Sequence, residues 1–216
     1  MHGPFHGTLT IKNHIPLKKG MGSSTALVVA ITRCLLGQGK RAEALAIENQ
    51  VNPGGSGIDF EVIWTEKPIL FRKDTEPKPI ALPADLLKNA LLIDTGEPNE
   101  TTPELVAWVK GRAEDPRVKQ ALMMIGKCAE RLQKGEDIRT VLRDHHRAQI
   151  ALGVVPKPVQ MLIKEIERLG GAAKVLGAGG KSGGGGIIWA IHKNPILILP
   201  FIRKHAQSVL PFNALP

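Results

Sequence analysis

One short segment rich in glycine and serine, Gly20-Met21-Gly22-Ser23-Ser24-Thr25-Ala26, has the composition of an anion-binding loop. An apolar run over residues 26–31 follows it and predicts a buried helix. Glycine lets a ligand approach the backbone closely, and the first-turn N–H groups of a helix have no partner within the helix. A serine at this boundary either caps the helix or turns its hydroxyl toward a phosphate or a metal ion. The segment therefore predicts a phosphate-binding loop, and the alternative is a well-capped core helix after a turn.

Two carboxylates are the best candidates to act with this loop. Glu48 lies near the end of a predicted helix over residues 41–51, and Asp59 follows the Gly- and Pro-rich loop 52–58. Phosphoryl transfer from a nucleotide needs Mg²⁺ ligands, a phosphate cradle and a group that orients or deprotonates the acceptor. Ser24 and Glu48 are the candidate metal ligands, and Asp59 is the candidate base. The alternative for each acid, taken alone, is a solvated surface charge.

A second glycine-rich segment, Gly177-Ala178-Gly179-Gly180-Lys181-Ser182-Gly183-Gly184-Gly185-Gly186, stands between predicted strands 172–176 and 187–191. It is not a P-loop, because Val175 occupies a required glycine position and a strand, not a helix, follows. The first segment is not a dinucleotide fingerprint either, because Thr25 stands in place of the third glycine. A flexible hairpin is the alternative for the second segment. Ordering so many glycines costs entropy, which favours a loop that has a ligand.

Histidine and cysteine patterns give no further site. The adjacent His145 and His146 would point about 100° apart on a helix, so they are interpreted as a polar helix face and not as a shared metal site. Cys34 and Cys128 fall in apolar helical stretches and are expected in the core, without a disulfide.

The composition sets the class of protein. The chain has 216 residues with 43% hydrophobic residues, enough for a real core, and no apolar run long enough to predict a membrane span. Its start lacks a signal-peptide pattern, so a cytoplasmic protein is expected. The net charge of +9 is spread along the chain, and there is no tyrosine, so nucleic-acid binding is the weakest hypothesis. Small anionic substrates fit the charge equally well.

The predicted elements mix helices and strands without a regular βαβ repeat, which favours an α+β fold. Before the proline-rich stretch 75–83 we expect a strand over residues 5–15, helices from the first glycine segment to about Leu36 and over 41–51, and short strands at 63–64 and 69–71. The domain boundary is placed in this stretch, giving domains 1–84 and 85–216.

The second predicted domain begins with a buried strand, residues 90–96. A Thr cap followed by Pro103 at the first helical position then begins a helix, and three amphipathic helices follow. Strands 172–176 and 187–191, a helix at about 195–205 and a short terminal strand complete it.

Several of these segments resemble one family in the same order. Residues 16–26, Pro16-Leu17-Lys18-Lys19-Gly20-Met21-Gly22-Ser23-Ser24-Thr25-Ala26, resemble the phosphate-binding motif of the GHMP small-molecule kinases, and Gly177-Ala178-Gly179-Gly180 resembles their C-terminal glycine motif. Within that superfamily the chain most resembles mevalonate kinase. Gly55-Ser56-Gly57-Ile58-Asp59 is similar to its Pro-Ser-Gly-Ile/Val-Asp segment, and Glu48 precedes Asp59 by the family's spacing. The segment Asp94-Thr95-Gly96, followed by residues 101–106, is similar to one in which a Thr, here Thr102, lies near the catalytic Asp.

The resemblance implies a two-domain GHMP-kinase fold: an N-terminal domain of the ribosomal S5 domain 2-like type and a ferredoxin-like α+β C-terminal domain. It implies ATP- and Mg²⁺-dependent phosphorylation of mevalonate or a related hydroxy acid. Ser24 and Glu48 would hold Mg²⁺, and Asp59 with Thr102 would be catalytic. Gly20, Met21, Gly22, Ser23, Ser24 and Thr25 would bind the nucleotide together with Gly177, Ala178, Gly179 and Gly180.

The chain also departs from the family pattern. No residues before Gly20 match the family's initial Pro-Gly-Lys…Gly-Glu-His segment, which carries an active-site Lys, so we expect a member whose N-terminal domain is incomplete. The sheet edge left in this way predicts a homodimer or a partner chain that covers it. Asn52-Pro53-Gly54-Gly55 replaces the usual His-Gly-Asn-Pro, and residues 181–186 are extra. Phosphomevalonate kinase, another GHMP kinase and a non-catalytic nucleotide- or partner-binding relic are the alternatives.

Overall fold

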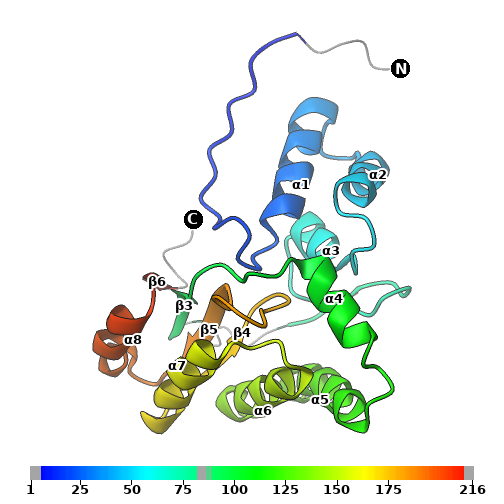
Figure 1. The fold of residues 1–216 in the computed structure, drawn as a ribbon. Coiled ribbons are helices and arrows are strands. Elements are labelled where there is room, and N and C mark those ends of the chain that lie inside the picture. Colours follow the sequence, from blue (N-terminus) through cyan, green and yellow to red (C-terminus); the bar gives the residue numbers. More distant parts are fainter. Residues whose placement is uncertain (1–5, 82–86, 88, 212–216) are drawn as a thin grey trace.

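The computed structural model describes residues 6–81, 87 and 89–211. Three helices form its first part: α1 (Ser23–Leu36), α2 (Arg41–Val51) and α3 (Ile58–Thr65). They share a small core of Val29, Ala44 and Phe60, each almost fully buried. A two-stranded antiparallel pair, β1 (Ile69–Leu70) with β2 (Lys78–Pro79), follows. Figure 1 shows these helices gathered at one end of the molecule.

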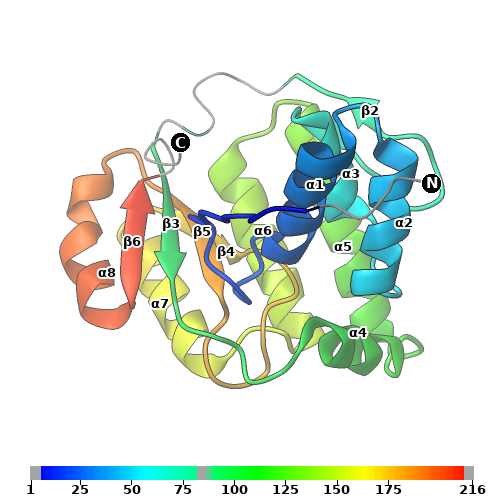
Figure 2. The same cartoon turned by 90° about the horizontal axis from the view of Figure 1, so that it is seen from above.

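A four-stranded antiparallel sheet organises the second part. Its strands are β3 (Ala90–Asp94), β4 (Ala172–Val175), β5 (Ile187–Ile191) and β6 (Ser208–Pro211), in the order β4-β5-β3-β6. In chain order this is 2-3-1-4, the strand order of a ferredoxin-like sheet. All five residues of β3 are buried, as expected for a strand covered on both faces. The prediction of an α+β fold with a ferredoxin-like second domain is confirmed (Figure 2).

Four helices lie between β3 and β4: α4 (Thr102–Lys110), α5 (Pro116–Gln133), α6 (Ile138–Leu152) and α7 (Lys157–Arg168). The 3₁₀ turn η1 (Pro195–Leu197) and α8 (Leu199–His205) lie between β5 and β6. Alternate side chains of the strands point to opposite faces of the sheet. On one face Ile93 and Ile188 pack against Ile163 and Ile166 of α7 and Ile202 of α8. Each such side chain contributes roughly 1.5–3 kcal/mol when it is buried.

The other face of the sheet packs against α6. Ala90, Ala172 and Ile191 are neighbours in the strand register and share a cluster with Leu142. Because α6 also makes extensive contact with α5, these two helices form a further layer on this face. The sequence prediction of three amphipathic helices between the strands is therefore confirmed in α5, α6 and α7.

Two strand predictions in the first part are wrong. Residues 6–15, the described part of the expected strand 5–15, form no regular element, and Figure 1 shows them as an extended chain that joins no sheet. Alternation alone does not supply a pairing partner, and Leu9 and Ile11 remain 46% and 52% exposed. Ile63 and Trp64 belong to α3, where the Trp64 ring stacks on Phe60 one helical turn earlier.

Smaller corrections concern a helix cap and a cysteine. The residue that caps α4 is Thr101, in a capping box with Glu104, so Pro103 is the second helical residue and not the first. The domain boundary expected after residue 84 lies outside the described residues. Cys128 is buried as expected, but Cys34 is exposed. Among the residues that the structure describes, no helix is long and apolar enough to cross a membrane.

Candidate active site

The first glycine segment forms a tight turn at the start of α1. Gly20 and Gly22 have φ values of 77° and 65°, in the left-handed region that favours glycine. Gly22 is the N-cap of α1, and no side chain caps the helix. The first-turn N–H groups therefore have no capping partner, which leaves them available to an anion. This observation favours the phosphate-binding loop over the alternative of a serine-capped core helix.

The second glycine segment packs directly on the first. A Cβ added at Gly177 would lie 2.7 Å from Gly20 Cα, so the two backbones meet where no side chain fits. The N–H of Ile187 donates to the Lys19 carbonyl at 3.0 Å, which fixes the entry of the first segment against the start of β5. The two predicted glycine loops are thus brought together.

The end of β3 holds the second glycine loop in place. Thr95 Oγ1 donates to the Gly186 carbonyl at 2.7 Å and accepts from the N–H of Gly185 at 3.0 Å. Glu100 accepts from the N–H groups of Lys181 and Ser182 at 2.8 and 3.2 Å. These bonds tie the loop in its middle and at the end that leads into β5, so the loop is an anchored structure and not an unattached hairpin.

A polar network joins α1 to α2 behind the first loop. Thr25 Oγ1 donates to Glu48 Oε1 at 2.7 Å, and Asn52 Nδ2 donates to the same oxygen at 2.9 Å. Ser24 Oγ donates to Asn52 Oδ1 at 3.1 Å. The other oxygen, Glu48 Oε2, is buried without a hydrogen-bond partner. An unpaired carboxylate oxygen is costly inside a protein, and a cation is the partner that would satisfy it.

Asp59 lies at the start of α3 and faces the first loop. Asp59 is exposed to solvent, and its Cγ lies 3.4 Å from the position that a Cβ added at Gly22 would take. Burial of the carboxyl group raises the pKa of Asp59, and the negative charge of Glu48 raises it further. The first-turn position of α3 favours a carboxylate, but these two effects outweigh it. Asp59 is therefore a stronger proton acceptor than an ordinary surface aspartate.

The donor set fits Mg²⁺ better than a metal held by protein alone. Within the described ranges, no three His, Cys, Asp or Glu side chains are grouped to hold a metal ion. Mg²⁺ is usually bound by one or two protein groups together with waters and substrate phosphates. The unpartnered Glu48 oxygen and the nearby Ser24 hydroxyl agree with that pattern.

Comparison with known proteins gives one family match and several structural matches. Residues 2–59 match the family of the GHMP kinases N terminal domain. The mevalonate kinase of Methanococcus jannaschii superposes with a TM-score of 0.74 at 19% identity over 91% of this chain and 64% of that one. The resemblance to the GHMP kinases is thereby confirmed.

Two further solved structures agree with this. The mevalonate kinase of L. major, in complex with R-mevalonate, has a TM-score of 0.64 and 21% identity over 88% of this chain and 64% of that one. Another mevalonate kinase has a TM-score of 0.73 and 20% identity over 91% of this chain and 65% of that one. At these identities the likeness establishes a GHMP-kinase fold, and the chain spans about two thirds of the length of these structures. No curated protein sequence matches the chain significantly.

The structure adds residues to the site that the sequence did not identify. Asn52 bridges Ser24 and Glu48, and its signal was its place one helical turn after Glu48. Lys19 forms an ion pair with Asp94 at 2.5 Å and also donates to Gln207 Oε1 at 3.1 Å. No sequence signal pairs Lys19 with residues so far along the chain.

Thr102 is exposed, whereas His145 is half-buried and His146 is buried. Thr102 is the exposed first residue of α4, and its role beside Asp59 stays a prediction. The interpretation of His145 and His146 as a polar face is wrong, because His146 is buried and His145 lines a cavity. Burial lowers the pKa of His145 to about 3 and that of His146 to about 4, so both are neutral at neutral pH.

Proposed function

We propose that this GHMP-kinase fold transfers the γ-phosphoryl group of ATP to a hydroxyl group of mevalonate or a related hydroxy acid, with Mg²⁺. The observation that carries the proposal is the arrangement of Glu48 and Asp59 around the uncapped start of α1. Glu48 has an unpartnered buried oxygen, and Asp59 has a raised pKa. Raised carboxyl pKa values beside a phosphate-binding loop are more typical of a catalytic site than of a solvated surface.

In this proposal the first loop binds the phosphates. The N–H groups at the start of α1 donate to the phosphate oxygens, and the second glycine loop closes beside them at Gly177. Ser24 and Glu48 hold Mg²⁺, and Asn52 keeps these two side chains in position through its amide. Bound Mg²⁺ would neutralise negative charge on the phosphoryl group.

Asp59 acts on the acceptor. The acceptor oxygen forms a bond to the γ-phosphorus, the bond from that phosphorus to the ADP oxygen breaks, and Asp59 takes the hydroxyl proton. The raised pKa improves Asp59 as a proton acceptor, while the Glu48 charge that contributes to it also attracts the cation. Two observations support mevalonate as the acceptor: the fold is similar to that of the mevalonate kinases named above, and the segment around Asp59 resembles theirs.

The test measures ATP binding and ATP turnover with mevalonate, using the 216-residue chain. Asp59→Asn should bind ATP normally and lose at least about 100-fold in turnover, since general-base catalysis contributes about 10²–10⁴-fold. Glu48→Gln should weaken the Mg²⁺ dependence of ATP binding. Asp74→Asn and Glu130→Gln are matched controls at exposed positions and should change neither quantity.

The outcomes separate the candidate functions. Phosphorylation of phosphomevalonate but not of mevalonate would identify the protein as a phosphomevalonate kinase instead. ATP binding without turnover on either acceptor would favour a non-catalytic nucleotide-binding protein. A folded wild-type chain that binds no ATP would refute the proposal.

A further inference from the structure

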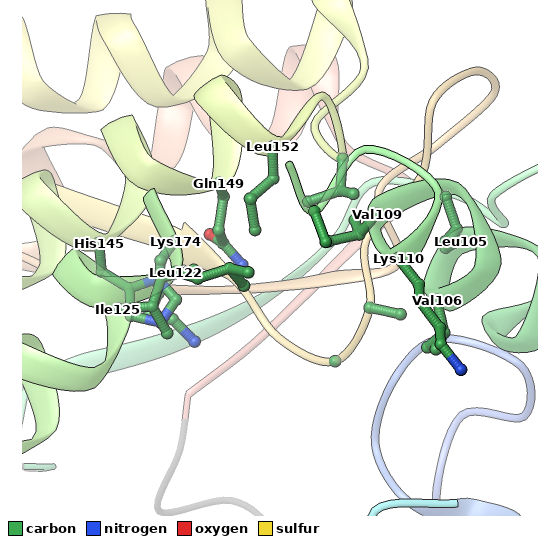
Figure 3. A pocket seen from close by; sticks show the side chains of 14 residues that line it. Leu105, Val106, Val109, Lys110, Leu122, Ile125, His145, Gln149, Leu152 and Lys174 are labelled. Atoms are coloured by element: carbon green, nitrogen blue, oxygen red, sulfur yellow. The ribbon is translucent and has the colours of Figure 1, made fainter. Parts of the chain in front are cut away.

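An apolar cavity of about 560 Å³ lies in the second part of the molecule, and its lining includes neither Asp59 nor Glu48. Its volume is within the roughly 300–1,000 Å³ typical of small-molecule sites. Figure 3 shows its walls, which come from α4, α5, α6, β4 and the start of the second glycine loop. The apolar wall residues include Leu105, Val106, Val109, Leu122, Ile125 and Leu152. No local sequence pattern indicates this cavity, because its lining comes from elements that are separate in the sequence.

Lys174 is the unusual group in this cavity. It lies on β4, its side chain is half-buried and lines the cavity, and among the described residues it forms no hydrogen bond or ion pair. Burial lowers the pKa of Lys174 to about 8, with a smaller opposing influence of Cys128. Lys174 therefore still carries its positive charge at neutral pH, in a mostly apolar environment.

The other polar groups in the cavity do not balance this charge. Gln149 uses its amide on the backbone of Val175, donating at 2.9 Å and accepting at 3.2 Å. His145 is neutral, and its Nδ1 is buried without a partner. Lys110 is a second cation at an exposed position, where water screens its charge. No carboxylate is among the residues that line the cavity.

An ammonium group without a counter-ion in a mostly apolar cavity is unfavourable, and a bound anion would reduce that cost. One ammonium group matches one negative charge, whereas a phosphate monoester brings nearly two. The apolar walls suit a hydrocarbon body. We propose that this cavity binds a small amphipathic carboxylate, with its carboxylate on Lys174 and its hydrocarbon chain against α4 and α5.

This inference does not depend on the proposed kinase activity, and no residue of the first glycine segment lines the cavity. The two regions share only one border among the lining residues, because Gly177 and Ala178 line the cavity and belong to the second glycine loop. A ligand in the cavity therefore contacts Gly177 and Ala178 directly, and Gly177 in turn packs on Gly20. Binding of the ligand should change the environment of the Gly177 and Ala178 backbone.

The test uses octanoate and its neutral counterpart 1-octanol as probes, measured by calorimetry on the whole chain. We expect one saturable octanoate site, and octanol binding at least tenfold weaker, a difference of about 1.4 kcal/mol. Lys174→Met should lose at least tenfold in octanoate affinity and keep its affinity for octanol. Lys164→Met, at an exposed position outside the cavity, is the matched control and should bind octanoate normally.

Two further measurements locate the probe and control for folding. The amide resonances of Gly177 and Ala178 should shift with octanoate, while those of Gly22 and Asp59 should not. Lys174→Met should be at least as stable to urea as the wild type, and Lys174→Gln provides a second variant if it does not fold. Equal affinity for octanol, unchanged octanoate affinity in a folded Lys174 variant, shifts centred on Asp59, or no binding would each overturn the proposal.

Discussion

The contact between the two glycine loops can be tested with a single methyl group. Gly177 has a φ of 59°, and a Cβ added there would lie 2.7 Å from Gly20 Cα and 3.1 Å from the Gly20 carbonyl oxygen. Both neighbours are backbone atoms, so no side chain can rotate away. Gly177→Ala must therefore move one loop relative to the other.

The expected cost has two parts. The left-handed backbone costs a non-glycine residue roughly 1–2 kcal/mol. Forcing extra volume into a packed site costs typically about 1–3 kcal/mol more. Gly177→Ala should therefore destabilise the fold by roughly 2–5 kcal/mol, with the second part arising from the contact with Gly20.

A matched variant separates the two parts. Gly135, after α5, has a φ of 78°, and a Cβ added there would meet nothing within 4 Å. Gly135→Ala should show only the backbone cost of roughly 1–2 kcal/mol. Urea unfolding of both variants gives the difference, and ATP affinity should fall for Gly177→Ala alone. Equal destabilisation with unchanged ATP affinity in both variants would refute the close packing of the two loops.

Three other predictions concern charge and association. Asp59→Asn should raise the free energy of unfolding at pH 7, because the raised pKa means that the folded state disfavours this carboxylate; the gain should vanish as the pH falls below the ordinary aspartate pKa, and equal stabilities at pH 7 would contradict it. The folded-state pKa values of His145 and His146 lie below the unfolded value of about 6.5, so their contribution to stability is present above pH 6.5 and is lost as the pH falls toward about 4. At pH 5 this amounts to roughly 2 kcal/mol for each histidine, and His146→Leu should show a smaller loss of urea stability between pH 7 and pH 5 than the wild type does. The homodimer stays a prediction, and apolar side chains exposed on α1–α3, such as Leu27 at 41% and Ile47 at 37%, are the residues with which to test it. Sedimentation should show self-association that Ile47→Lys reduces, and a monomer at all concentrations would contradict the homodimer.

The sequence predicted those elements whose local signals agree with their tertiary environment. α2 has the predicted bounds, and α1 ends at the predicted Leu36, because glycines interrupt the chain just outside them. The apolar stripe of α7 predicted its packing on the sheet, since residues at helical spacing such as Ile163 and Ile166 necessarily share a face. The glycine loops were found from composition alone, because few other residues tolerate such close backbone contact.

The failures arose where long-range pairing or enclosure decides the outcome. Residues 6–15 have the alternating pattern of a strand, but a strand also needs a neighbouring strand for its hydrogen bonds. The sequence of one segment does not specify that partner. Lys19 and Asp94 are brought together by the fold, not by spacing. The burial of His146 and the position of Lys174 in the cavity likewise depend on how α6 packs on β4, which no local pattern specifies.

The candidate site is built from features that work against stability. Glu48 keeps a buried oxygen without a partner, although Thr25 and Asn52 satisfy its other oxygen. Burial of the Asp59 carboxyl group and the nearby charge of Glu48 both raise the pKa of Asp59. Replacing either acid would make the fold more stable, because neighbouring like charges and unpaired carboxylate oxygens are unfavourable inside a protein. Their presence together beside an uncapped helix start is explained if a cation and a phosphate complete the site, which is the physical reason for favouring a kinase over a merely structural loop.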